Sequence, residues 1–334
     1  MVIVKCGFFI ERYSLNVVFV GSSKFGLRCL NQCLQFAEIN VVGVVTSPKV
    51  FSISYNKSGV NNVLHAGVGP FASQHAIPFK IMESSMNEPC LLEEVSKWNP
   101  DIFLVVGWYH IVPESWLRVA PAYGLHASLL PNYSGGAPLV WAMINGETKT
   151  GITLFQMDAG IDSGPVVGFK EEQIRINDTI ATLYQRIEER GLELLEELLP
   201  LIVTGKMKLQ LQNESKRKIM PQRSPKDGMI DWRMSSIFID RFIRAQTKPY
   251  PGAFSFWDGE QVIIWDVSLC EKENDSLIGF VVKENDGCRV YCGKGSVILN
   301  EVSFRNKSYT YSEIIELFKD GGRFNKLTVV SRQK

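Results

Sequence analysis

The chain has few histidines, almost no net charge and no long apolar run. Four of its 334 residues are histidines, and 36 Lys and Arg against 35 Asp and Glu give a formal net charge of +1. This balance gives no hint of a nucleic-acid or acidic-membrane partner. No apolar run approaches the roughly 20 residues of a membrane-spanning helix. Since 45% of the residues are apolar, we expect a globular, cytoplasmic protein with no membrane partner.

Cysteine is present, but not in the pattern of a disulfide framework or a zinc site. The seven cysteines are scattered and odd in number, and the closest pairs, at 29/33 and 288/292, lack the His and Cys partners that zinc needs. We predict reduced, mostly buried thiols and no bound metal. The chain also shows no internal repeat and no low-complexity tract.

The first half of the chain alternates strand-like and helix-like segments. Residues 16–20 form an apolar strand-like run, a small turn follows at Gly21-Ser22-Ser23, and residues 25–36 have helical spacing. This order predicts the opening of a parallel α/β sheet. The turn lacks the full dinucleotide glycine fingerprint, so we predict no NAD site. It either meets a phosphate at the helix N-terminus or serves only as a turn.

Further segments continue this alternation. We expect strands at 41–46, 77–81, 101–106 and 152–155, helices at 89–98 and 179–203, and a long polar loop at 47–69. The charged face of the long helix is expected to be solvated. It comprises Arg186, Glu188, Glu189, Arg190, Glu193 and Glu196.

The length of the chain predicts two domains. Residues 1–15 are expected to be an N-terminal extension, since Lys5 interrupts the apolar start and no small-residue cleavage site follows. We place the first domain at 16–204, a polar linker at 205–220 and a second domain at 221–334. The second domain contains alternating runs that predict a small β-barrel. These runs are residues 262–267, 277–282, 288–292 and 297–302.

One stretch, residues 124–164, has the features of a built site. It contains His126 and Asp162, and it includes two loops rich in small residues, 131–138 and 160–164. Backbone in such loops can approach a ligand closely. A histidine exchanges a proton near neutral pH, and a carboxylate that reaches it can fix its tautomer. We predict that His126 and Asp162 form a catalytic pair; the alternative is a core histidine and a turn aspartate.

Three ordered blocks lie in this stretch. They read H-A-S-L-L-P-N-Y-S-G-G-A-P from His126, N-G-E-T-K-T-G-I-T from Asn145 and M-D-A-G-I-D-S-G from Met157. This pattern resembles the 10-formyltetrahydrofolate-dependent formyltransferases, and the resemblance extends over roughly residues 16–265. It implies a Rossmann-like, mostly parallel α/β catalytic domain followed by an OB-like barrel. It also implies N-formyl transfer with 10-formyltetrahydrofolate as formyl donor.

The resemblance further implies where the two substrates bind. The turn after the strand at 101–106 and the two blocks around His126 and Asp162 would line the folate site. The implied folate-binding residues are Gly107, Trp108, Tyr109, Leu130, Asp158, Ala159, Gly160 and Asp162. The candidates for contact with the acceptor are Ser128, Tyr133, Ser134, Arg223, Arg244 and Tyr250.

The sequence departs from the family pattern at two positions. The family commonly has asparagine two residues before the histidine, where this chain has Gly124, and arginine where it has Ser134. The first departure removes a side-chain donor for the oxyanion of the tetrahedral intermediate. A backbone N–H, a bound water or Ser128 would have to replace it, and losing one such donor costs on the order of 10²–10³ in rate.

Charge and length discriminate among the acceptors used in this family. The loop at 47–69 offers Lys49, Lys57 and no arginine, and residues 221–334 hold 17 Lys and Arg against 15 Asp and Glu. Weak basicity disfavours tRNA, and the extra domain disfavours the smaller glycinamide ribonucleotide enzyme. We predict formylation of an amino-deoxysugar nucleotide for surface polysaccharide (lipopolysaccharide) synthesis. The alternatives are methionyl-tRNA formylation, formyltetrahydrofolate hydrolysis and a non-catalytic folate- or nucleotide-binding protein. The sugar, the base, the ring position and homodimer formation remain open.

Overall fold

The computed structural model describes residues 14–53, 56–285 and 287–324. Most of the predicted N-terminal extension (1–15) lies outside these ranges. The chain divides into two compact units. The first unit runs through residue 131 and includes 152–170 and 188–216; the second contains 132–151, 171–187 and 217 onward. Because the predicted linker at 205–220 contributes to both units, the predicted domain boundaries stay a prediction.

The first unit is built on a seven-stranded sheet in the order β10-β9-β7-β6-β1-β2-β5. Neighbours β7 and β6, β6 and β1, β1 and β2, and β2 and β5 are parallel, whereas β9 is antiparallel to β7. The strands are β1 Leu15–Val20, β2 Ile39–Thr46, β5 Phe79–Ile81, β6 Ile102–Val105, β7 Ala122–His126, β9 Lys149–Gln156 and β10 Val166–Gln173. The predicted mostly parallel α/β sheet is confirmed.

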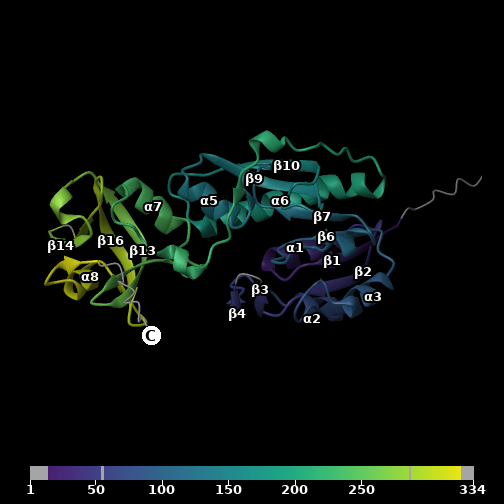
Figure 1. Ribbon diagram of the computed structural model, residues 1–334, viewed down its shortest axis with the longest axis horizontal. Helices are drawn as coiled ribbons and strands as arrows, with labels where there is room; N and C mark the ends of the chain where they lie inside the picture. Colours follow the sequence, from purple (N-terminus) through teal and green to yellow (C-terminus); the bar gives the residue numbers. More distant parts are fainter. Residues whose placement is uncertain (1–13, 54–55, 286, 325–334) are drawn as a thin grey trace, which may run out of the picture. The chain divides into compact units, whose positions relative to one another are not determined.

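Buried apolar strands explain this sheet, and helices accompany it (Figure 1). All four residues of β6 and the last four of β1 are buried, as parallel strands covered on both faces require. Ser23 caps α1, its Oγ accepting a hydrogen bond of 3.0 Å from the Gly26 N–H. The turn at 21–23 thus serves as a helix cap. The helices are α1 Lys24–Cys33, α2 Val68–Gln74, α3 Pro89–Ser96, α4 Glu114–Leu117 and α6 Ile180–Val203, of which α6 belongs partly to the second unit.

The expectation of a plain loop at 47–69 is wrong. Strands β3 (Val50–Ile53) and β4 (Asn56–Asn61) pair antiparallel within it, with Val50 opposite Asn61. The polar, glycine-containing sequence hides this hairpin because strand preference depends on packing partners as well as on residue type.

The second unit contains an antiparallel sheet in the order β12-β13-β16-β15-β14-β18, with β17 paired to β16. The strands are β12 Ala253–Trp257, β13 Glu260–Cys270, β14 Phe280–Glu284, β15 Gly287–Tyr291, β16 Ser296–Phe304, β17 Lys307–Thr310 and β18 Gly322–Arg323. Figure 1 shows α7 (Ser236–Arg244) beside β13, and α8 (Ser312–Leu317) lies against the same sheet. This barrel-like sheet confirms the predicted architecture. The strand predicted at 277–282 begins later than expected, because β14 starts at Phe280.

The rest of the second unit precedes or connects these strands. Helix α5 (Pro138–Ile144) packs against α7, and the short strands β8 (Ser134–Gly135) and β11 (Ile219–Met220) are parallel. Short 3-10 helices span Glu214–Lys216, Pro225–Gly228 and Asp275–Leu277, the first of them in the first unit. The core of the barrel-like sheet is apolar, with Trp232 stacked on Phe324 at a centroid distance of 5.3 Å.

Two findings bear on the classes of protein considered above. In the ranges that the structure describes, no helix is long and apolar enough to cross a membrane.

Burial raises the pKa of the buried Cys29 thiol and raises that of Cys33 to about 12. Both thiols are therefore protonated at neutral pH and act as small apolar groups in the core.

Candidate active site

His126 is the last residue of β7, in the first unit. It pairs with Thr153 on β9, and its side chain is 11% exposed. The backbone that follows is held to β9, because Thr153 Oγ1 donates to the Ser128 carbonyl at 2.7 Å and accepts from the Leu130 N–H at 3.3 Å. The imidazole therefore projects from a strand whose neighbours fix it on both sides.

Asp162 lies in the turn between β9 and β10 and faces this imidazole. Its Oδ2 is 3.5 Å from His126 Nδ1, and its side chain is 22% exposed. Asp162 has a left-handed backbone (φ +51°), which an aspartate tolerates better than most residues. Asp158 orders the same turn, since its Oδ1 accepts hydrogen bonds from the Gly160 N–H at 3.0 Å and from Ser163 Oγ at 2.6 Å. The structure thus brings the predicted pair together.

A side chain at Gly124, which stands where the family commonly has asparagine, would have to displace Met157. A Cβ atom there would be 2.5 Å from Met157 Cε and 3.2 Å from the Phe155 ring. The space that an amide would occupy is therefore filled by a thioether methyl group. The sequence shows the missing asparagine, but it does not reveal that Met157 takes its place.

The turn after β6 holds three of the predicted folate-binding residues. Gly107 has φ +60° and packs tightly, since a Cβ there would be 1.8 Å from Ser23 Oγ. The Trp108 indole N–H points to Met86 Sδ at 3.1 Å, whereas Tyr109 is 44% exposed. The turn lies beside the point where the strand order reverses between β1 and β6, and ligands of open α/β sheets bind at such a point.

The other predicted folate-binding residues lie on two further loops of the first unit. Asp158, Ala159 and Gly160 are exposed, and Leu130 is half-buried. Near Trp108, His110 lies 4.8 Å from the Phe51 ring, and burial lowers the pKa of its imidazole. His110 is therefore uncharged at neutral pH and packs with aromatic rings.

The predicted acceptor residues are dispersed, and Tyr133 and Ser134 are engaged with other parts of the second unit. Tyr133 is 8% exposed, and its hydroxyl donates to Glu147 Oε1 at 2.6 Å and accepts from Asn145 Nδ2 at 3.3 Å. Burial, followed by the hydrogen bond to Glu147, raises the pKa of Tyr133 to about 12. Ser134 is fully buried and pairs with Ile219 of β11. Ser128, in the first unit, is also fully buried.

Arg223 and Arg244 have different environments. The Arg223 guanidinium lies over the rings of Trp141 (4.8 Å) and Phe242 (5.6 Å), and burial lowers its pKa. Its Nη2 donates to the Asp227 carbonyl at 2.8 Å and to Gln246 Oε1 at 3.1 Å, with no ion pair in the described part of the chain.

Arg244, in contrast, is paired with a carboxylate. It bonds Asp240 Oδ2 at 2.8 Å and the Asp178 carbonyl at 2.6 Å. Tyr250, the remaining acceptor candidate, is half-buried. Of the two arginines, Arg223 therefore has the charge that is better placed to meet an anion.

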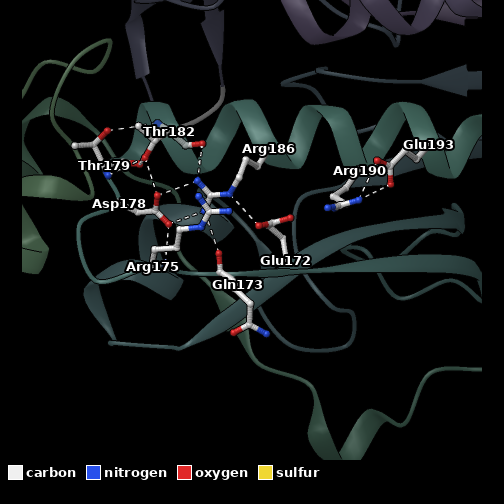
Figure 2. Close-up of polar contacts among 9 residues, drawn as sticks. All are labelled: Glu172, Gln173, Arg175, Asp178, Thr179, Thr182, Arg186, Arg190 and Glu193. Atoms are coloured by element: carbon white, nitrogen blue, oxygen red, sulfur yellow. Dashed lines mark hydrogen bonds and ion pairs between the residues drawn. The ribbon is translucent and has the colours of Figure 1, made fainter.

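The expectation of a solvated charged face on α6 is wrong for Arg186 (Figure 2). Its side chain is 21% exposed and pairs with Glu172 at 2.9 Å and with Asp178 at 2.6 Å, carboxylates that are 7% and 5% exposed. Asp178 also accepts hydrogen bonds from the Arg175 N–H at 2.7 Å and from Thr182 Oγ1 at 2.8 Å. Burial opposes ionisation of Asp178, but its hydrogen bonds to Arg186 and its neighbours outweigh this effect and lower its pKa.

Among residues 14–53, 56–285 and 287–324, no cluster of three or more His, Cys, Asp or Glu side chains could hold an ion. A histidine with a carboxylate beside it, as at His126 and Asp162, is an arrangement that can transfer a proton.

Comparison with known proteins gives a consistent family. Residues 15–199 match the family described as formyl transferase, and residues 223–317 match the formyl transferase C-terminal domain. The methionyl-tRNA formyltransferase of Geobacter sulfurreducens is 31% identical over 297 residues, which cover 88% of this chain and 90% of that protein.

Solved structures share the fold at lower identity. An N-formyltransferase from Helicobacter canadensis, in complex with folinic acid and dTDP-3-aminofucose, has a TM-score of 0.62 and 19% identity, covering 88% of this chain and all of that chain. The methionyl-tRNA formyltransferase from Clostridium thermocellum has a TM-score of 0.51 and 17% identity, covering 76% and 93%.

Proposed function

Because the chain belongs to the formyl transferase family, we propose that it transfers a formyl group from 10-formyltetrahydrofolate to an amine, with His126 and Asp162 as its catalytic pair. The contact of 3.5 Å between His126 Nδ1 and Asp162 Oδ2 is the observation that carries this proposal. The exposed Tyr109 and the exposed turn at 158–160 fit the accessible surface that a folate needs.

The residues of the first unit suit this reaction. The amine nitrogen adds to the formyl carbon of the donor to form a tetrahedral intermediate that carries an oxyanion, and the bond from that carbon to N10 then breaks. Since Nδ1 of His126 faces Asp162, Nε2 is the atom that accepts the proton lost by the amine. Asp162 stabilises the resulting imidazolium, which returns the proton to the leaving N10. The oxyanion requires a donor other than position 124, such as a backbone N–H or a water, because the predicted alternative, Ser128, is fully buried.

The acceptor that the comparisons support better is methionyl-tRNA. The similarity to methionyl-tRNA formyltransferases spans both matched domains and nine-tenths of the Geobacter sulfurreducens protein. If the acceptor is a tRNA, the protein has a nucleic-acid partner, contrary to the prediction from its charge. It would need several cationic contacts to phosphates, gathered on one face of the protein despite the balanced overall charge.

An amino-deoxysugar nucleotide is the second candidate acceptor, and charge is the observation that favours it. Residues 221–334 hold 17 Lys and Arg against 15 Asp and Glu, and the segment 47–69 has only two lysines. A sugar nucleotide presents two phosphates, which fewer cations can bind. Arg223, which lacks an ion pair in the described part of the second unit, is the residue that we assign to such a contact.

One assay decides between these acceptors. The protein is incubated with 10-formyltetrahydrofolate and either initiator methionyl-tRNA or a panel of amino-deoxysugar nucleotides, and products are identified by mass. Formylmethionyl-tRNA supports the first candidate, and an N-formyl sugar nucleotide supports the second and rejects the first. Formate released without an acceptor indicates a hydrolase. Folate binding without turnover on any acceptor would overturn the enzyme proposal in favour of a binding protein.

A further inference from the structure

Gln212 reaches the turn that carries Asp162, although it lies in the segment predicted as a linker. The chain leaves α6 and passes beside the start of β10, where Gln210 and Val166 exchange two backbone hydrogen bonds of 2.8 Å. Two residues later, Gln212 Nε2 donates to the Asp162 carbonyl at 2.8 Å and to the Gly164 carbonyl at 2.6 Å. All of these residues belong to the first unit.

The chemistry of this contact fixes how the Gln212 amide is oriented. Only the NH₂ end can face two carbonyl oxygens, so both of its hydrogens are used on the turn. The other end, Oε1, is buried without a hydrogen-bond partner among the residues that the structure describes. Buried polar atoms are nearly always satisfied. The Gln212 amide binds the turn with its NH₂ end although its Oε1 end stays unsatisfied. This indicates that the two hydrogen bonds to the turn are important enough to offset the unsatisfied oxygen.

We propose that Gln212 is a positioning residue, which holds the turn so that Asp162 faces Nδ1 of His126. The left-handed backbone of Asp162 (φ +51°) needs surroundings that hold it in place. Asp158 fixes the turn through Gly160 and Ser163, and Gln212 fixes it through the carbonyls of Asp162 and Gly164. Without Gln212, the carboxylate loses its fixed direction toward the imidazole. The consequence for turnover rests on the proposed function, whereas the geometric claim does not.

The variant that tests this role is Gln212→Met, which keeps the length of the side chain and removes its donors. Gln210→Met is the matched control, because Gln210 is exposed and its contacts to Val166 are made by backbone atoms. We expect kcat of Gln212→Met to fall about 10- to 100-fold with KM little changed, since a displaced catalytic group slows the chemical step. The control should retain full activity. Equal kcat values in the two variants would overturn the proposal.

A second variant tests the hydrogen bonds themselves. Gln212→Glu has the same shape but places carboxylate oxygens against the two carbonyls, so it should be no more active than Gln212→Met. Wild-type activity in Gln212→Glu would reject the proposed contacts.

Nitrogen NMR of the His126 ring separates this inference from the proposed function, because it needs no turnover. The His126 signals are identified as those lost in His126→Gln. In the wild-type chain the neutral ring should carry its proton on Nδ1, opposite Asp162, and this preference should weaken in Gln212→Met but not in Gln210→Met. Unchanged tautomers in Gln212→Met would overturn the proposal even in an active enzyme.

A measurement on the unsubstituted protein covers the case in which the variants fail to fold. The side-chain NH₂ protons of Gln212 should exchange slowly with water, because both are bonded to backbone carbonyls, whereas those of the exposed Gln210 should exchange fast. Fast exchange at Gln212 would reject the proposed contacts.

Discussion

Two polar clusters of this molecule, Asp162 with His126 and Asp178 with Arg186, differ in the lengths of their contacts. Asp178 accepts hydrogen bonds of 2.6 to 2.9 Å from Arg186, Arg175 and Thr182. Asp162 lies 3.5 Å from His126, beyond ordinary hydrogen-bond distance. Catalytic contacts are often long before substrate binds. The Asp178 cluster is therefore suited to holding the fold, and the Asp162–His126 pair to the proton exchange that we propose.

The largest effect is expected from His126→Ala, which removes the proposed base. Turnover should fall about 10²- to 10⁴-fold, while folate binding and thermal stability are retained because the ring is at the end of a strand rather than in the core. Steady-state rates and folate titration measure this. His75→Ala, at an exposed histidine of the same unit, is the control. Full activity in His126→Ala would contradict the proposed difference between the two clusters, since neither of them would then be catalytic.

Asp178→Asn should show the opposite behaviour, with stability lost and turnover per folded molecule kept. Removing one partner of a buried pair typically costs 3–5 kcal/mol, and because Glu172 still pairs with Arg186 we expect about 2–3 kcal/mol. Urea unfolding measures the change in the free energy of unfolding. The matched control is Glu193→Gln, which breaks the exposed pair with Arg190 (Figure 2) and should cost less than about 1 kcal/mol. Equal losses in the two variants would show that Arg186 and its partners are solvated, as the sequence suggested for Arg186.

Gly124→Asn restores the amide of the family pattern next to the proton-transfer pair. It should destabilise the protein by about 1–3 kcal/mol, because the new side chain collides with Met157. The double variant Gly124→Asn/Met157→Ala should recover part of this loss, and the two changes should be non-additive. Thermal unfolding and rate measurements on these two variants and on Met157→Ala check this. Additive effects would mean that Met157 does not fill the missing place.

These residues also show which parts of the fold and of the candidate site could be predicted from the sequence. The buried runs at 17–20 and 102–105 predicted the parallel strands, and glycine-rich blocks predicted where His126 and Asp162 lie, because both signals are local. Arg186 and Gln212 were missed for a common reason. Their partners are backbone carbonyls and carboxylates distant in sequence, and a polar residue on a helix or in a linker has the same local pattern whether solvated or buried.

The smallest expected effect is the pH dependence of stability. It shows whether burial or hydrogen bonding determines the pKa of Asp178. Its hydrogen bonds lower its pKa in the folded protein, against the effect of burial, so its contribution to stability is complete above the unfolded value near 4. This contribution is lost as pH falls from there through the lowered folded pKa. The difference in unfolding free energy between wild type and Asp178→Asn should therefore stay constant from about pH 8 to about pH 5 and shrink only below about pH 4.

Urea unfolding of both proteins across this pH range measures the difference in unfolding free energy, in which the contributions of the other carboxylates cancel. A difference that already shrinks between neutral pH and about pH 5 would mean that burial prevails and raises the pKa of Asp178. The Asp178 cluster would then be a strained pair rather than the stabilising one that contrasts with the longer contact of His126 and Asp162.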